Sequence, residues 1–282
     1  MRAFVHELRL LAVALQFLTR IPVPLRRFDP QWLHHSARHF PAVGMLVGAF
    51  GACVLAGASL IWPAPVAVLA SMAATAWLTG GFHEDGLADT CDGLGGAVSR
   101  ERALEIMKDS RLGSYGALGL AFTLALKAAA LVALAAHSIA VAAGALVFAH
   151  AASRACAVVL MGALPYAGDV DHAKAKPMAR PAGALAPAVA LGWTLALAAA
   201  VALAGSGAAA ARVLPDELAA IVPVALPVAL AAALLATVAV TALCGRWLRR
   251  RLGGYTGDTL GATQQWTELS IYLALAALLL PA

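Results

Sequence analysis

The sequence predicts an all-α fold, a polytopic bundle of transmembrane helices. Hydrophobic residues make up 62% of the 282-residue chain, charged residues make up 12%, and the mean hydropathy is +0.82. Water-soluble domains carry about 25% charged residues, so this chain is too apolar to cover itself with a polar surface. Apolar runs of about 20 residues, long enough to cross the roughly 30 Å hydrocarbon core of a bilayer, recur along the sequence. The lipid bilayer is therefore the first partner that we expect.

Seven spans are expected, at residues 41–61, 64–82, 114–136, 139–162, 183–205, 217–244 and 263–281. Before them, residues 3–19 are apolar but interrupted by Glu7, Arg9 and Gln16, a pattern typical of an interfacial or partly inserted helix. No small-residue cleavage site follows, so this segment is not expected to be a cleaved signal peptide. Because neither an internal repeat nor a low-complexity linker occurs, residues 1–282 are expected to form a single membrane domain.

The basic residues follow the positive-inside rule. Segments 1–40, 83–113, 163–182 and 245–262 contain every Lys and Arg except Lys127, Arg154 and Arg212. Cytoplasmic loops carry such an excess, so we expect these four segments on the cytoplasmic side of a bacterial inner membrane. Membrane orientation also accounts for the net charge of +5 without nucleic acid as a partner, since no aromatic–basic motif is present. The four scattered cysteines predict neither a zinc site nor a disulfide framework.

An acidic cluster directly after the second expected span is the most unusual feature of the sequence. Four of the 15 acidic residues lie within nine positions, 84–92, and on a helix three of them share one face. Carboxylates this close repel one another unless a cation or protons compensate. Oxygen ligands without cysteine favour Mg²⁺, Mn²⁺ or Ca²⁺. The expected metal ligands are Glu84, Asp85, Asp89 and Asp92; the alternative is a solvated acidic segment that caps the next helix.

Two polar segments on the same predicted side could complete the site. Lys108, Asp109 and Arg111 precede a glycine-rich helix start, where side chains and backbone amides can bind phosphate. Positive-inside anchoring explains the two basic residues almost as well. Thr256 and Asp258 lie in the glycine-rich loop 245–262, where backbone can approach a ligand closely. The alternative there is an ordinary turn followed by an aspartate N-cap.

Charged residues and glycines inside the expected spans indicate further contacts. Lys127 and Arg154 lie within spans, where an ionisable side chain indicates function by default. Arg154 can line a polar cavity and bind a phosphate, or it can snorkel to the surface; Lys127 receives no role. Glycines at helical spacing allow close helix packing, although they are also common in membrane helices generally: Gly44 and Gly48, and Gly113, Gly116 and Gly119.

The cluster Glu84–Gly93 resembles the signature of the adenosylcobinamide-GDP ribazoletransferase family, also called cobalamin synthases. Three further blocks are similar to that family and follow in its order: Phe17–Pro24, Ile106–Gly116 and Gly254–Ala262. Together the four blocks span most of the chain. Cys91 departs from the family pattern, where a small residue such as Ala is expected, and a small thiol should be tolerated there.

The resemblance implies a Mg²⁺-dependent transferase of the last stage of vitamin B12 biosynthesis. Its substrates would be adenosylcobinamide-GDP and α-ribazole, or α-ribazole 5′-phosphate, and its products adenosylcobalamin, or the corresponding 5′-phosphate, and GMP. The cluster would hold Mg²⁺ against the diphosphate, and one carboxylate would be the base. The residues so assigned to catalysis are Asp85, Asp89, Asp92 and Asp258. Those assigned to substrate and phosphate are Lys108, Asp109, Arg111, Arg154, Thr256 and Asp258.

Two other functions fit a membrane protein with an acidic motif. CDP-alcohol phosphotransferases also carry several aspartates on helices, but their pattern continues with Ala-Arg and more widely spaced aspartates, whereas here Asp89 follows Ala88. A divalent-cation transporter would place its acids near the bilayer midplane, whereas these lie at a predicted cytoplasmic end. The sequence is compatible with a homo-oligomer and does not specify one.

Overall fold

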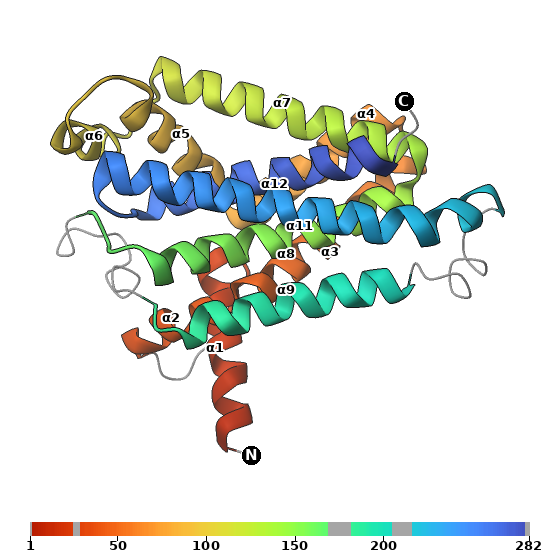
Figure 1. The fold of residues 1–282 in the computed structure, drawn as a ribbon, viewed down its shortest axis with the longest axis horizontal. Coiled ribbons are helices and arrows are strands. Elements are labelled where there is room, and N and C mark those ends of the chain that lie inside the picture. The colour runs from red at the N-terminus through yellow and green to blue at the C-terminus, as the bar shows by residue number, and fades with distance from the viewer. Residues whose placement is uncertain (1, 25–28, 169–181, 205–215, 280–282) are drawn as a thin grey trace.

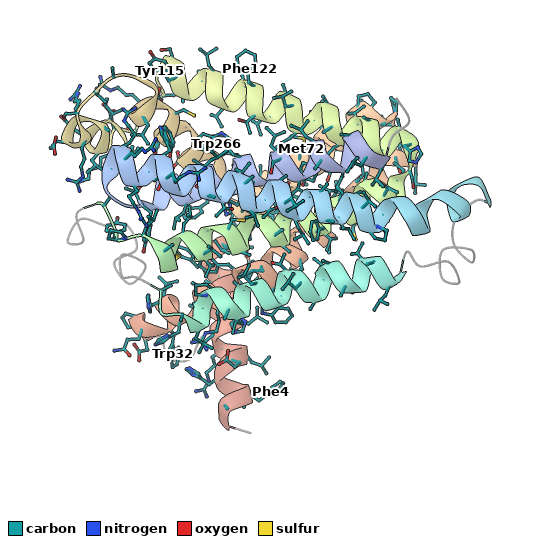
Figure 2. All side chains as sticks on the ribbon, viewed as in Figure 1. Phe4, Trp32, Met72, Tyr115, Phe122 and Trp266 are labelled. Carbon is teal, nitrogen blue, oxygen red and sulfur yellow. The ribbon has the colours of Figure 1, made fainter. Side chains whose placement is uncertain are left out.

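The computed structural model describes residues 2–24, 29–168, 182–204 and 216–279, and most of these residues lie in helices (Figure 1; side chains in Figure 2). No β-strand occurs in these ranges, so the all-α class is confirmed. The long helices are α3 (Phe40–Ser59), α4 (Ala64–Thr79), α7 (Ser114–His137), α8 (Ile139–Ala163), α9 (Leu185–Ala204), α11 (Asp216–Leu252) and α12 (Gly257–Leu279). The shorter ones are α1 (Arg2–Leu18), α2 (Pro30–Ser36), the 3₁₀ helix η1 (Ala37–His39), α5 (Phe82–Gly95) and α6 (Arg100–Ile106).

Each expected span lies largely within one of the long helices, but not every helix is a simple span. Five described helical segments are long and apolar enough to cross a membrane: 30–59, 114–137, 139–163, 185–203 and 226–252. Helices α4 and α5 together give a sixth if the bent pair is one span. Helix α12 covers the seventh expected span but buries Gln264, Gln265 and Glu268 in its first half. The polytopic bundle is therefore confirmed, with five or six apolar spans where the sequence suggested seven.

Helix α8 lies at the centre of the bundle, and glycines bring α3 against it. A Cβ atom added at Gly48 would lie 2.6 Å from the Cα atom of Val147. One added at Gly44 would overlap the carbonyl group of His150. Both separations are far too short for a real side chain, so only glycine permits this backbone approach. The close packing expected at this glycine pair is confirmed.

The acidic motif and the polar segments predicted to complete its site lie at one end of the bundle. Figure 1 shows α5, α6, the start of α7 and the α11–α12 connection at the same end. The expected loop 83–113 contains α5 and α6, and the expected loop 245–262 shrinks to residues 253–256 because α11 continues to Leu252 and α12 begins at Gly257. The N-terminal helix α1 runs across the direction of the long helices (Figure 1). That orientation agrees with an interfacial helix.

A pair of glycines turns α5 away from α4. Gly80 and Gly81 have φ angles of +74° and +69°, in the left-handed region that favours glycine, and the two helix axes differ by 89°. The N-terminal segment supports this bend: the Arg20 backbone N–H donates to the Leu78 carbonyl over 2.8 Å, and the Phe17 and Phe82 rings meet edge to face at 5.6 Å. The Phe17–Pro24 block therefore positions the start of the acidic helix.

Candidate active site

Helix α5 packs directly on the first turns of α12. A Cβ atom added at Gly86 would lie 2.8 Å from the carbonyl oxygen of Asp258, and one added at Gly261 would lie 3.4 Å from the Cα atom of Gly86. The acidic motif and the segment that follows the glycine-rich loop are thus in contact, as the composite-site hypothesis required. Asp258 lies in the first turn of α12 and is half-buried there.

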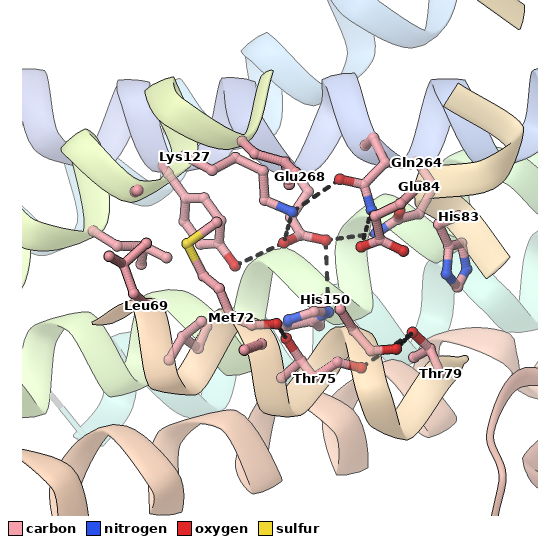
Figure 3. Close-up of a pocket in the computed structure, with 18 of the residues that line it drawn as sticks. Leu69, Met72, Thr75, Thr79, His83, Glu84, Lys127, His150, Gln264 and Glu268 are labelled. Atoms are coloured by element: carbon pink, nitrogen blue, oxygen red, sulfur yellow. Dashed lines mark hydrogen bonds and ion pairs between the residues drawn. The ribbon is translucent and has the colours of Figure 1, made fainter. Parts of the chain in front are cut away.

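Glu84 lies between two cavities. The inner cavity, of about 340 Å³, is lined by side chains from α4, α5, α7, α8 and α12 (Figure 3). The outer one, of about 650 Å³, is more open and includes Asp85 and the glycine bend. Glu84 and Thr79 line both cavities. The Oε1 atom of Glu84 accepts a hydrogen bond of 3.0 Å from Gln265 Nε2, whereas its Oε2 atom is buried and has no partner among the described residues.

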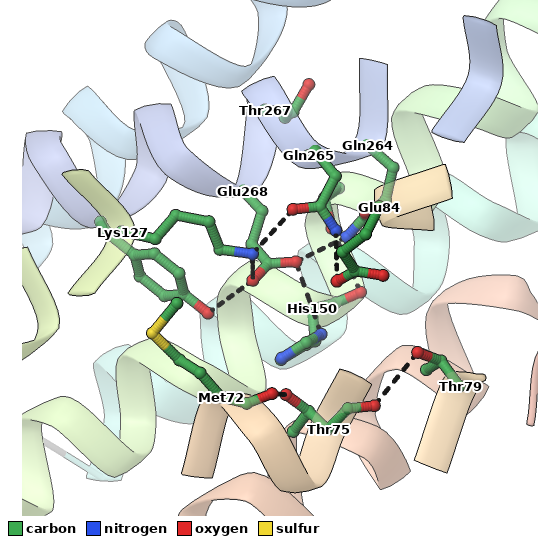
Figure 4. Close-up of polar contacts among 12 residues, drawn as sticks. Met72, Thr75, Thr79, Glu84, Lys127, His150, Gln264, Gln265, Thr267 and Glu268 are labelled. Atoms are coloured by element: carbon green, nitrogen blue, oxygen red, sulfur yellow. Dashed lines mark hydrogen bonds and ion pairs between the residues drawn. The ribbon is translucent and has the colours of Figure 1, made fainter. Parts of the chain in front are cut away.

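Glu268 is the centre of the polar contacts in the inner cavity (Figure 4). Its Oε1 atom lies 2.6 Å from Lys127 Nζ and accepts a 3.1 Å hydrogen bond from the Tyr272 hydroxyl. Its Oε2 atom accepts one of 2.6 Å from Gln264 Nε2. A buried carboxylate is tolerable only when it is paired and hydrogen-bonded in this way.

Lys127 extends these contacts towards the acidic helix. Its Nζ atom also donates to Gln265 Oε1 over 3.0 Å, and the amide nitrogen of Gln265 in turn donates to Glu84 (Figure 4). The contacts therefore form a continuous chain from Glu268 on α12 to Lys127 on α7, back to Gln265 on α12 and on to Glu84 on α5. Lys127, whose role was not predicted from the sequence, connects Glu268 to Gln265.

Arg154 lines the same cavity and is 2% exposed. It does not reach the surface, so the cavity-lining alternative is confirmed over snorkelling. One of its terminal nitrogens donates to the His150 carbonyl over 2.8 Å and lies 3.1 Å from His150 Nδ1. Its Nε atom has no partner among the described residues. Binding of a phosphate by Arg154 remains a prediction.

The other three acids of α5 do not join Glu84 in one cluster. Asp92 caps α7: its Oδ2 and Oδ1 atoms accept hydrogen bonds of 2.7 Å from the backbone N–H groups of Gly113 and Gly116. Asp85 is exposed and Asp89 is half-buried one turn later. Within the described part of the chain, no three Asp, Glu, His or Cys residues are arranged to hold a metal ion. The expected four-carboxylate set is thus not preassembled, and for Asp92 the structure shows the helix cap that was the alternative.

The close approach of α7 to Asp92 explains the second expected set of glycines. A Cβ atom at Gly113 or Gly116 would overlap the Asp92 carboxylate, and one at Gly119 would overlap the Cys91 sulfur atom. Glycine is therefore required along this face of α7, and the expected close packing is confirmed here too. Cys91 occupies its position with its thiol directed at α7, which agrees with a small packing residue.

The residues assigned to phosphate binding have partners of other kinds or none. Arg111 and Asp109 pair with each other, and hydrogen bonds from Arg111 hold the pKa of the Asp109 carboxyl at about 2. Lys108 is exposed. The Thr256 hydroxyl accepts from the Thr259 N–H over 3.2 Å while Thr259 Oγ1 accepts from the Thr256 N–H over 2.8 Å, a reciprocal cap of α12. The cap is thus Thr256 rather than the aspartate.

Arginines outside the cavity fix the helix ends around the site. Arg251 donates to the carbonyls of Leu94 and Gly96 at the end of α5, over 3.3 and 2.9 Å. Arg100 donates over 2.7 Å to the Leu252 carbonyl at the end of α11. Basic residues that the positive-inside rule explained by orientation alone therefore also bind carbonyl groups that a helix end leaves without partners.

The sequence reasoning missed most of the inner cavity. Its unassigned polar residues include His150, Gln264, Gln265, Glu268 and Tyr272. The signal that could have found them is a polar side chain within an apolar membrane helix. Two consecutive glutamines and a glutamate inside an expected span are the clearest instance.

Comparison with known proteins agrees with this architecture. Residues 10–276 match the family model described as cobalamin-5-phosphate synthase. The chain is 57% identical to an adenosylcobinamide-GDP ribazoletransferase of Leptothrix cholodnii over 97% of each chain. It is 43% identical to one of Shewanella amazonensis, over 99% of this chain and 98% of the relative. No solved structure matches. The chain therefore belongs to the cobalamin-5-phosphate synthase family, whose members are enzymes of cobalamin synthesis.

Proposed function

We propose that this protein joins adenosylcobinamide-GDP to α-ribazole, or to α-ribazole 5′-phosphate, and releases GMP. The names of its relatives support the donor and the ribazole-type acceptor. The family model that matches residues 10–276 supports this function rather than the other two that the sequence allowed. In the reaction a ribazole hydroxyl attacks the phosphorus atom attached to cobinamide, the phosphoanhydride bond to GMP breaks, and the hydroxyl proton leaves to a base.

The observation that carries the proposed site is the free oxygen of Glu84. Its Oε2 atom is buried without a partner among the described residues, at the boundary between the polar inner cavity and the open outer one. A buried carboxylate oxygen without a hydrogen-bond partner destabilises the folded protein. A ligand that binds this oxygen would remove that destabilisation. The oxygen is therefore suited to a cation or to a hydrogen-bond donor of the substrate.

The arrangement of Glu84 and Asp85 suits Mg²⁺ although the four carboxylates are not gathered into one cluster. Mg²⁺ is usually held by one or two carboxylates and completed by substrate phosphates and water, so a preassembled group of three acids is not required. Glu84 and Asp85, which both line the outer cavity, would hold it, with Asp89 one helical turn away. Mg²⁺ bound there would neutralise negative charge on the departing GMP.

The remaining residues would bind and orient the substrates. Lys127 and Arg154 place two positive charges on the wall of the inner cavity, where they can attract phosphate oxygens. Lys127 also fixes Gln265, and Gln265 fixes Glu84 through its amide. The base remains one of the α5 carboxylates or Asp258, whose backbone contacts α5 at Gly86. Asp92 positions the start of α7 at the rim of the site.

The positive-inside rule supports a cytoplasmic site in a bacterial inner membrane. Helices α5 and α6 and the α11–α12 connection, which carry two of the four basic segments, lie at one end of the bundle (Figure 1). A site at that end would receive its nucleotide-linked substrate from the cytoplasm.

The test is GMP release by the purified protein in lipid vesicles supplied with adenosylcobinamide-GDP and either acceptor, with Mg²⁺ or with a chelator. E84Q should raise the Mg²⁺ concentration needed for half-maximal rate by at least about tenfold. E105Q is the matched control, because Glu105 is an exposed glutamate on α6 whose partner is Arg102. Release that continues unchanged in chelator would exclude Mg²⁺, and an unchanged E84Q would exclude the proposed ligand.

A further inference from the structure

A third cavity lies between α8, α9 and α11, away from the two cavities of the candidate active site. It measures about 610 Å³, within the range of pockets that hold small organic molecules. None of its lining residues lines either cavity beside Glu84. We call it the lateral groove. Its wall is mainly aliphatic and includes Ala152, Val159, Leu160, Leu191, Val238 and Ala242.

The few polar atoms on the wall of the lateral groove already have partners. The hydroxyl groups of Thr194, Thr237 and Thr241 each donate to the carbonyl four residues earlier in the same helix, over 3.2, 2.7 and 2.7 Å. The Cys156 thiol donates to the Ala152 carbonyl over 3.3 Å. Apart from the arginines at one end, the wall therefore offers no free donor to a polar ligand, and the part of the ligand that fills it must be apolar.

The rim of the lateral groove faces outward. Leu195 and Val238, on α9 and α11, are 57% and 65% exposed, and both helices are among those long and apolar enough to span a membrane. Figure 1 shows α8 lying between these two helices and behind them. A groove opened in this way meets the acyl chains of the surrounding bilayer.

Two arginines stand at one end of the groove. Arg246 and Arg249 both line it, one helical turn apart on α11. Arg246 is exposed and makes no hydrogen bond or ion pair with any described residue. Arg249 spends one donor on the Ala163 carbonyl, at 3.2 Å, and keeps the others. An apolar groove that ends at one unpaired guanidinium group and at a second with donors still available matches a ligand with a hydrocarbon chain and an anionic head.

We propose that the lateral groove binds one anionic glycerophospholipid, with an acyl chain between α8, α9 and α11 and its phosphate at Arg246 and Arg249. Guanidinium groups bind phosphate oxygens with strong, directional hydrogen bonds. Basic residues near a membrane surface also attract anionic lipids more strongly than zwitterionic ones. The site is separate from the proposed transferase chemistry and does not depend on it.

Native mass spectrometry of the detergent-purified protein tests the site. The probes are phosphatidylglycerol, phosphatidylcholine with the same acyl chains, and inorganic phosphate. The wild type should retain one phosphatidylglycerol in preference to phosphatidylcholine by about thirtyfold, as two basic residues at a membrane surface predict. Inorganic phosphate should not displace it, because the acyl chain contributes most of the contact. R246Q/R249Q should lose the preference.

R250Q is the matched control, because Arg250 follows on the same helix but does not line the groove; it should keep the preference. R246Q alone removes no contact within the described structure and guards against a folding defect in the double variant. V238W, which fills the rim, should reduce retention of both lipids. Equal retention of the two lipids by the wild type, or an unchanged preference in R246Q/R249Q, would show only a general lipid annulus and overturn the proposal.

Discussion

The outer and inner faces of α5 both carry carboxylates, but the carboxylate on the outer face is exposed and the one on the inner face joins a buried set of polar contacts. On the outer face, Asp85 is exposed to solvent, where water can stabilise its charge. On the inner face, Glu84 joins a chain of contacts through Gln265 and Lys127 to Glu268, which is 1% exposed. A carboxylate buried in the bundle is stable only when it is paired or hydrogen-bonded, whereas a carboxylate on the surface is stabilised by water.

The fold should be most sensitive to mutation where a carboxylate is buried. Glu84 and Asp85 are neighbours in the sequence, but Glu84 also lines the inner cavity formed with four other helices, whereas Asp85 lines only the outer one. Removing a partner on the inner face should affect folding and activity together, whereas a change on the outer face should affect ligands alone.

Breaking the buried ion pair should have the largest effect. K127M leaves Glu268 buried without the cation at 2.6 Å, which should lower the free energy of unfolding by about 3–5 kcal/mol. K127M/E268Q should recover much of that loss because the carboxylate that Lys127 compensated is removed as well. Chemical unfolding in detergent measures both. R102M is the control, since it breaks an exposed ion pair of 2.7 Å that is worth less than about 1 kcal/mol. Equal losses in K127M and R102M would refute the contrast.

Separating α5 from α12 should come next. G86A places a methyl group 2.8 Å from the Asp258 carbonyl oxygen, so the helices must move apart at a cost of about 1–3 kcal/mol, and GMP release should fall. G57A is the matched control, because an added Cβ there meets nothing within 4 Å; alanine should stabilise that helix by up to about 1 kcal/mol. Similar behaviour of the two variants would argue against a tight contact.

Loss of the α7 cap should have a smaller effect. D92A removes the acceptor of the Gly113 and Gly116 N–H groups and should cost about 0.5–2 kcal/mol of unfolding free energy. D85A, the same substitution on the exposed face of the same helix, should leave unfolding unchanged. If D85A destabilised the protein as much as D92A, the outer face would carry a structural role that its exposure does not indicate.

The smallest effect should appear only at high pH. Burial raises the pKa of Tyr255 from 10.0 to about 12, so between these values the unfolded chain loses a proton that the folded chain keeps. Stability contributed by this group is complete below pH 10 and is lost as the pH rises through about 12. Unfolding measured across that range should therefore depend more steeply on pH in the wild type than in Y255F. Y115F, which alters an exposed tyrosine, should behave like the wild type.

The sequence predicted the features that are local or periodic. Apolar runs located the helices, basic residues grouped the connections, and glycine spacing located the α3–α8 contact. The acidic motif was found because its members are close together in the chain. The metal site stays a prediction. Helical spacing places Asp85, Asp89 and Asp92 on one face but does not reveal that Asp92 also caps another helix.

The inner cavity could not be predicted because its contacts join residues that are distant in the sequence. Lys127 and Gln265 are 138 residues apart, and Gln265 and Glu84 are 181 apart. No local pattern links such positions. The bend before α5 was missed for another reason: Gly80 and Gly81 are visible in the sequence, but glycine adopts positive and negative φ angles almost equally readily. Only the packed structure selects the left-handed pair.

The glycine bend has a consequence for how charge can accumulate in such a chain. With α4 across the bilayer, a helix that leaves it at 89° changes lateral position along its length rather than depth. Asp85 and Asp92 are then separated by about 10 Å along the membrane surface and meet the same interfacial solvent. Acidic residues can thus be added along α5 without shortening the hydrophobic length of α4. Mutations that introduce charge should accordingly be tolerated on the exposed face of α5 and rejected on α4, with Gly80 and Gly81 marking the boundary.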